Sequence, residues 1–372
     1  MKWKWLSSMV VVCLAALAAT CAWDRDTLAD EALAKKDVLR IIVGEFERNP
    51  PLYYQMRIDR VAKEVQAKPK DLGLYDDLGV ANDRLGNQDE AIVWMAKKAK
   101  AMEVGKPTDN DRYRYHANLG TFYAHRWFAR GADRGKLADL MLGIDHLKEA
   151  LTINPDAHFG REEYQLAILE WVLSGPKNET GVTSAGIDIS PLGDYLQTRG
   201  LLKKPKAIEG LSGLIRLGNA WESVDTFAAL SDALKAQRFG NVGKAAKLRC
   251  LELFTAGKSS LSSWKPETND AMEGGPLGEN RSLTISEFRR LRAESDAWHN
   301  KRTSFMISRL KQGLHPDTHA EFWNGYDQER FEVRDLPFYK KWEAGTWFIA
   351  VFGTCSLSTV LLAIYLLRRK TS

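Results

Sequence analysis

Apolar residues recur three and four positions apart through most of the chain, whereas strict alternation of apolar and polar residues is rare. The first clear row at this spacing comprises Tyr54, Ile58, Val61 and Val65. It follows Pro50 and Pro51, and proline suits the first turn of a helix because its φ angle is already helical. Pro69 ends the segment. The pattern predicts an all-α protein.

The segment 71–104 combines helical spacing with small and bulky residues in a fixed order. The positions that define this order are Tyr75, Leu78, Gly79, Gly86, Ala91 and Ile92. Gly79 and Ala91 allow two helices to approach closely, and Gly86 suits the turn between them. The order resembles the tetratricopeptide repeat, a helix–turn–helix unit of about 34 residues. Lys98 and Glu103 stand where that repeat has Ala and Pro, so the match weakens towards its end.

A second unit of the same kind begins near Tyr113. Leu119, Gly120 and Tyr123 match the first helix of the repeat. Ala150, Leu151 and Pro155 match its end once the frame is shifted. We interpret 130–136 as part of an enlarged turn that accounts for this shift. The resemblance extends over about 54–171, within a predicted repeat region of 23–173, and it implies a solenoid of helix pairs.

The register is lost after Trp171, and composition defines the remaining segments. Residues 174–206 are rich in Gly and Pro and are predicted to form a loop. Residues 207–257 are interpreted as degenerate helical repeats, with helices over 207–217, 220–236 and 242–256. Residues 258–283 are predicted to be a linker. Thr284 and Glu287 form a capping-box pattern, which opens a long helix ending at Gly313 within a segment of 284–344 that leads to the membrane.

The two ends of the chain have the composition of targeting and membrane segments. Residues 1–22 have a basic start, an apolar stretch and small residues, as a signal peptide does. Residues 345–367 carry no charge, are long enough to span a bilayer, and precede a basic tail at 368–372. We therefore expect a single-pass membrane protein with its body on the extracytoplasmic side and its C-terminus in the cytoplasm. Cleavage of the signal, retention of the signal as an anchor, and lipidation of Cys21 all remain open.

Charge content disfavours one class of protein, and cysteine content excludes another. The 53 Lys and Arg against 48 Asp and Glu give a net charge of +5 over 372 residues. The five cations at the termini, Lys2, Lys4, Arg368, Arg369 and Lys370, account for this excess. The body is therefore neutral, which disfavours a nucleic-acid-binding footprint. Four cysteines are too few for a disulfide scaffold, although a bond between Cys21 and Cys250 remains open.

Motifs for catalysis are scarce, so we predict that the protein is not an enzyme and has no cofactor. His315 and His319 have the spacing of two ligands on one helix face. Pro316 stands where a zinc protease needs its glutamate, and we interpret it as the first residue of a short helix. The alternative function is an extracytoplasmic helical enzyme with a metal site near these two histidines.

The resemblance to the tetratricopeptide repeat implies a scaffold that binds a protein or peptide in a concave groove. In that family the first helix of each unit lines the groove, and an Asn in this helix pairs with the peptide backbone. Asn118 holds this place in the second unit, whereas the first unit has Asp77. Asp83, Tyr115 and Thr121 are further candidates. The basic helix after Thr284 also suggests contact with anionic lipid or an acidic partner, and no small-molecule partner is assigned.

Overall fold

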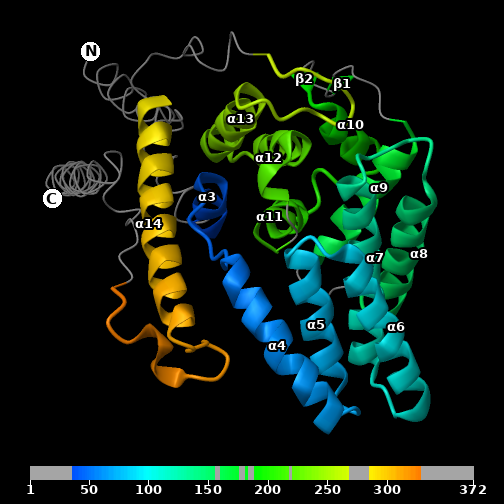
Figure 1. Cartoon of the computed structure of the whole chain (residues 1–372). Helices are drawn as coiled ribbons and strands as arrows, with labels where there is room; N and C mark the ends of the chain where they lie inside the picture. The colour runs from blue at the N-terminus through cyan, green and yellow to red at the C-terminus, as the bar shows by residue number, and fades with distance from the viewer. Residues whose placement is uncertain are drawn as a thin grey trace, which may run out of the picture. The chain divides into compact units, whose positions relative to one another are not determined.

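The computed structural model describes residues 36–155, 160–175, 181–182, 188–217, 220–267 and 285–327. All of these except Lys36 belong to one compact unit, which covers 37–273 and 283–330. The described residues are helical apart from turns, connecting segments and two short antiparallel strands, β1 (Gly181–Val182) and β2 (Asp188–Ile189) (Figure 1). The predicted all-α class is therefore confirmed for the described part of the chain.

The first half of the unit is a series of helices joined by short turns. These are α3 (Lys36–Val43), α4 (Pro51–Ala67), α5 (Leu72–Arg84), α6 (Gln88–Val104), α7 (Asp109–Ala129), α8 (Ala138–Ile153) and α9 (Arg161–Leu173). Pro51 opens α4 as predicted, and α3 is a further helix that the sequence pattern did not indicate. Gly86 turns the chain between α5 and α6 with a φ of 82°. An enlarged turn separates α7 from α8, as predicted for 130–136.

Two helical hairpins, α5–α6 and α7–α8, pack closely at the predicted glycines. A Cβ atom placed on Gly79 would lie 2.9 Å from Met95 Cε and 3.0 Å from a ring carbon of Phe122. A Cβ atom on Gly120 would lie 2.7 Å from Leu147 Cγ and 3.0 Å from a backbone oxygen in α8. Ala91 is fully buried in the same core. The small residues thus allow the helices to approach one another closely, as the sequence pattern predicted.

The second half of the unit contains more helix than the sequence pattern predicted. Its elements are α10 (Pro191–Thr198), α11 (Ala207–Leu217), the 3-10 turn η3 (Ala220–Glu222), α12 (Val224–Ala236) and α13 (Gly240–Thr255). The prediction of a continuous loop over 174–206 is wrong, because α10 and both strands lie within it. Ser190 caps α10, Pro191 occupies its first turn, and the apolar Leu192 and Leu196 are fully buried. The density of Gly and Pro obscured this two-turn helix.

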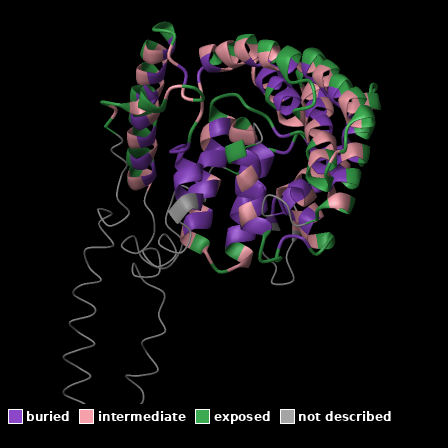
Figure 2. Cartoon of the chain, turned by 90° about the horizontal axis from the view of Figure 1, so that it is seen from below, coloured by how far each residue is buried: buried purple, intermediate pink, exposed green. Residues whose placement is uncertain are grey.

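Helix α12 lies at the centre of the buried core in the second half. Every residue from Val224 to Leu234 is buried. It packs against α10, α11 and α13. Figure 2 shows helices that are buried on nearly every side, and others that are buried along one stripe only. A helix buried over most of its length holds its neighbours in fixed positions.

The last described elements return to the start of the unit. They are α14 (Ile285–Lys311) and the 3-10 turn η4 (Ala320–Trp323). α14 contacts α4 and α13 (Figure 1). Tyr53 of α4 shares a core cluster with Met306, Leu310 and Phe322. Pro316 lies in a turn, so the prediction that it begins a short helix is wrong. The backbone oxygen and a ring nitrogen of His315 both accept hydrogen bonds from the residues that follow, and these bonds fold 315–319 into a tight turn.

Several predicted segments lie outside the described residues. They are the signal peptide (1–22), Thr284 of the capping box, the membrane helix (345–367) and the basic tail (368–372). In the portions for which coordinates are described, no helix has both the length and the apolar character that a bilayer crossing requires.

Candidate functional site

Polar side chains from α5, α7 and α9 meet along one face of the helical hairpins. We call this set the polar row, and it comprises Asp76, Asp83, Asn118, Thr121, His125 and Gln165. Three of the residues predicted from the sequence belong to it, namely Asp83, Asn118 and Thr121. The hydrogen bonds within the row link α5 to α7 at two levels and α7 to α9 at a third.

The first level of the polar row contains a buried ion pair. Lys98 of α6 is fully buried, and its Nζ lies 2.7 and 2.8 Å from the two carboxylate oxygens of Asp76. Asn118 Nδ2 donates to the same carboxylate at 2.9 Å. Burial raises the pKa of Asp76, while the Lys98 ammonium opposes that shift. The Lys that departs from the repeat pattern is thus the counter-ion of a buried aspartate, and the same aspartate accepts from Asn118.

The second level pairs Asp83 with His125. His125 Nδ1 lies 2.9 Å from both carboxylate oxygens of Asp83. The Asp83 side chain is 4% exposed and that of His125 is 15% exposed. This pair and the Asp76–Asn118 pair each span 42 residues. Equal spacing of two cross-helix bonds shows that α5 and α7 lie alongside one another in matching register.

The third level connects the second hairpin to α9. Gln165 Nε2 donates to Thr121 Oγ1 at 3.1 Å, and Thr121 Oγ1 donates to the carbonyl oxygen of Ala117. Both Gln165 and Thr121 are half-buried. Gln165 was not predicted as a site residue, because the candidates were taken from the first helices of the two matched units and α9 follows them. Gln165 would have been identified if the polar face of the first helices had been extended to α9.

The two other predicted site residues do not join the polar row. Tyr115 packs edge-on against His116 and against His146 of α8, at centroid distances of 5.1 and 6.2 Å. His116 and His146 share a hydrogen bond of 3.0 Å, and burial lowers the pKa of both. Asp77 is exposed and lies near Arg57 and Asp317. The charges of these two residues shift the pKa of Asp77 in opposite directions.

The geometry of His315 does not suit metal binding. Its Nε2 lies 3.1 Å from the carbonyl oxygen of Tyr53, so this nitrogen carries the hydrogen. Its Nδ1 accepts from the backbone N–H of Asp317 at 3.1 Å. Both ring nitrogens are therefore engaged within the protein. His319 Nδ1 accepts from the backbone N–H of His315, so the two imidazoles do not face a shared point. Within the described ranges no three His, Cys, Asp or Glu side chains are arranged to hold a metal ion.

Much of the positive charge of α14 is used in packing this helix against the unit. Arg292 pairs with Glu252 and Asp296. Arg302 is buried, with its guanidinium 4.9 Å from the ring of Trp323. The remaining exposed cations of the helix are Arg289, Arg290, Lys301 and Lys311. The helix therefore offers a weaker lipid- or acid-binding surface than its sequence suggested.

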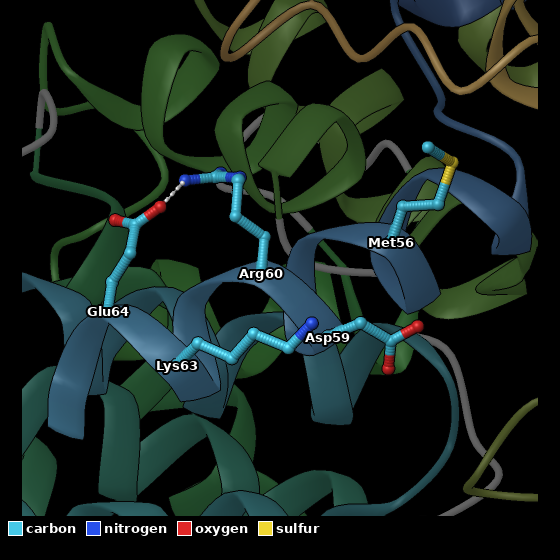
Figure 3. Close-up of a pocket in the computed structure, with 5 residues that line it drawn as sticks. All are labelled: Met56, Asp59, Arg60, Lys63 and Glu64. Atoms are coloured by element: carbon cyan, nitrogen blue, oxygen red, sulfur yellow. Dashed lines mark hydrogen bonds and ion pairs between the residues drawn. The ribbon is translucent and has the colours of Figure 1, made fainter.

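An open depression of about 480 Å³ lies along α4 (Figure 3). All five lining side chains come from this one helix, and they are Met56, Asp59, Arg60, Lys63 and Glu64. Arg60 and Glu64 pair with one another at 2.6 Å. A surface formed by one helix encloses no ligand and holds no convergent groups for catalysis, so the depression is not a candidate active site.

Comparisons with protein-family models, curated proteins and solved structures gave no match. The functional argument for this chain consequently depends on its own residues.

Proposed function

We propose that this protein is a membrane-tethered scaffold whose helical-repeat unit binds a polypeptide partner along the polar row. The single observation that supports this proposal is the row itself, in which three successive first helices contribute donors and acceptors to one face, buried on α5 and half-buried on α7 and α9. An extended peptide carries a donor and an acceptor at every residue, so a linear array of polar groups suits it. The resemblance of about 54–171 to the tetratricopeptide repeat implies the same mode of binding.

Asn118 is the residue best placed for contact with a peptide backbone. It donates one hydrogen bond to Asp76, which fixes the orientation of its amide. The Asn118 side-chain oxygen is then positioned to accept from a peptide N–H. An amide held in advance loses less conformational entropy when it binds, so the Asp76–Lys98 pair strengthens recognition without touching the partner. Exposed Arg114, one helical turn before Asn118, adds a cation beside the row.

Site-specific photo-crosslinking in membranes tests the proposed surface. A photoreactive amino acid at Arg114 should capture a discrete protein partner, and Asn118→Ala in the same chain should reduce the yield severalfold. The matched control places the photoreactive group at exposed Asp145 on α8, where no specific product is expected. Equal products from both positions, or a yield at Arg114 that Asn118→Ala leaves intact, would contradict binding along the polar row.

The tether is the second part of the proposal and rests on the sequence of 345–367. Three consecutive cations follow this uncharged segment, and each would cost roughly 2.5–3.5 kcal/mol at the centre of a bilayer on insertion scales. We therefore propose that the tail stays in the cytoplasm and the body lies outside it. Protease added from the extracytoplasmic side should digest the body and leave a small C-terminal fragment. Protection of the body with loss of the tail alone would reverse the orientation.

A further inference from the structure

A cavity of about 120 Å³ lies in the second half of the unit, away from the polar row. The residues that matter for its chemistry are Ser190, Asp232, Lys235, Lys247, Trp264 and Lys265. They come from the residue that caps α10, from α12, from α13, and from the segment after α13. Because four separate parts of the chain converge here, the cavity is more enclosed than the open depression on α4, with Lys235 and Lys265 exposed at its rim.

The floor of the cavity is rigid. Asp232 lies on the fully enclosed helix α12 and accepts two hydrogen bonds from Ser190, one from its backbone N–H at 2.9 Å and one from its hydroxyl at 2.7 Å. Ser190 Oγ in turn accepts from the backbone N–H of Gly193 at 3.1 Å. Burial raises the pKa of Asp232, whereas its bonds from Ser190 oppose that shift. Asp232 thus serves to anchor the start of α10 beneath the cavity.

Three lysines surround this floor without carboxylate partners. No ion pair or hydrogen bond is formed by the side chains of Lys235, Lys247 or Lys265 in the described structure. In contrast, Lys98, Lys204 and Lys258 each lie within 2.7 Å of a carboxylate oxygen. Lys247 Nζ lies 5.1 Å from the centroid of the Trp264 ring, which holds it at the cavity. Asp232 and Glu267 also line the cavity, but neither is in direct contact with these ammonium groups, and a cluster of cations that outnumbers its nearby carboxylates indicates a site for an external anion.

The electrostatics of Lys235 agree with this arrangement. The surrounding protein desolvates its ammonium and lowers its pKa, the Lys247 charge lowers it further, and Asp232 opposes both effects. Lys235 therefore lies close to a second cation and near the buried carboxylate. The cavity carries three positive groups against Asp232 and Glu267, which leaves an excess of one positive charge. An anion placed between the lysines would relieve their mutual repulsion.

We infer that this cavity binds the phosphate group of an anionic ligand, held by Lys235, Lys247 and Lys265. A volume of 120 Å³ is about four times the volume that one molecule occupies in liquid water. This space suits the five heavy atoms of a phosphate group. Lysine binds phosphate as a point charge without demanding a planar partner. Three ammonium groups can each approach a different oxygen of the tetrahedral anion. The inference does not depend on partner binding at the polar row.

Equilibrium dialysis with labelled inorganic phosphate and the full-length chain in a non-ionic detergent tests this inference. Lys247→Gln and Lys235→Gln should each weaken phosphate binding at least tenfold. The matched control is Lys203→Gln, which removes the same charge from an exposed lysine outside the cavity and should leave the affinity unchanged. Circular dichroism verifies that all three variants retain the parent helix content.

A second probe, glycerol 3-phosphate, distinguishes a free anion from a lipid headgroup. Binding of glycerol 3-phosphate at least tenfold tighter than inorganic phosphate, with the same dependence on Lys247, would assign the site to a phosphatidate-like headgroup. Comparable affinities would assign it to a free phosphate. The inference is overturned if neither probe binds, or if Lys203→Gln weakens binding as much as the two cavity variants.

Discussion

Buried charged residues in this protein hold parts of the chain together through specific hydrogen bonds and ion pairs. Asp225 and Asp232 lie on the enclosed helix α12. Asp225 accepts from the hydroxyl of Ser260 and the backbone N–H of Leu261, and Asp232 accepts from both groups of Ser190. Each carboxylate thus fixes a connecting segment to the core with two bonds. Asp76 pairs with Lys98 inside the α5–α6 hairpin and accepts from Asn118 of α7, which ties this hairpin to the next one.

The Lys98–Asp76 pair gives the first prediction. Asp76→Leu leaves a fully buried ammonium without its counter-ion, which should cost about 3–5 kcal/mol of unfolding free energy. The double variant Asp76→Leu/Lys98→Met buries no charge and should recover most of this loss. Urea unfolding followed by circular dichroism measures both. If the double variant is as unstable as the single one, the ion pair is not the cause of the loss.

His299 gives the second prediction, which concerns pH. Burial lowers the pKa of His299 to about 4, and the nearby Arg48 and Arg302 charges add to the effect. Its unfolded pKa is about 6.5, so the unfolded chain binds the extra proton first and the stability falls as the pH drops below that value. This group alone should cost about 2 kcal/mol between pH 7 and pH 5.

The variant His299→Leu isolates this contribution. Its unfolding free energy should depend on pH less steeply than that of the parent between pH 7 and pH 5, by about the same 2 kcal/mol. Thr303→Ala is the control, because Thr303 contacts His299 but does not titrate in this range. Burial also lowers the pKa of His116, His146 and His315, so some acid sensitivity should remain. An unchanged slope in His299→Leu would refute the assignment.

Residue chemistry alone predicted some of these positions and missed others for a physical reason. Gly79 and Gly120 were identified correctly, because a small residue between helices is required wherever their backbones approach. Lys98 was recognised only as a departure from the repeat. Its pairing with Asp76 depends on how α6 and α5 are rotated about their axes, and a single sequence does not determine that rotation to within one residue.

At the scale of elements, local capping and apolar spacing predicted most helices well. The predicted helix over 207–217 matches α11, and those over 220–236 and 242–256 differ from α12 and α13 by a few residues at their ends. α10 was missed, because it has only two turns and its burial depends on contacts with α12. Short helices gain stability mainly from tertiary packing, so sequence periodicity carries little information about them.

The interhelical glycines give the third prediction. Gly120→Ala should destabilise the protein by about 1–3 kcal/mol, because the added methyl group meets both Leu147 and the backbone oxygen of Gly143. Gly79→Ala should cost less, because its closest contact is the flexible end of Met95. Gly73→Ala in the first turn of α5 is the matched control, with its nearest contact at an ordinary 3.4 Å. Thermal melting of the three variants should place Gly120→Ala lowest. Equal melting temperatures would mean that the α7–α8 approach is looser than described.

At the scale of the whole compact unit, contacts between residues far apart in the sequence hold its early and late helices together. Asp317 binds Arg57 at 2.6 and 2.7 Å and Arg60 at 2.6 Å, across 257 to 260 residues. His315 stacks on Tyr53 at a centroid distance of 4.5 Å. α14 and the turn after it are thereby held against α4. No local pattern predicts such contacts, because their formation depends on the path of the entire chain between them. For the same reason the sequence left open, as the alternative, a metal site near His315 and His319, where the structure has a docked turn.

The Asp317 contact gives the last prediction. Asp317→Asn removes the carboxylate shared by two guanidinium groups and should lower the unfolding free energy at pH 7 by about 1.5–3 kcal/mol. Burial alone would raise the pKa of Asp317, but its bonds to Arg57 and Arg60 prevail and lower it. The stabilisation is therefore present above the unfolded pKa of about 4 and is lost as the pH falls through the lower folded value. Urea unfolding at pH 7 and pH 3, followed by tryptophan fluorescence, should show a difference in unfolding free energy between parent and variant that becomes smaller on acidification.

Asp59→Asn is the control on α4, since exposed Asp59 accepts only from Gln55 of the same helix in the described structure. A gap of equal size at both pH values would show that the Asp317 charge is not what holds the turn against α4.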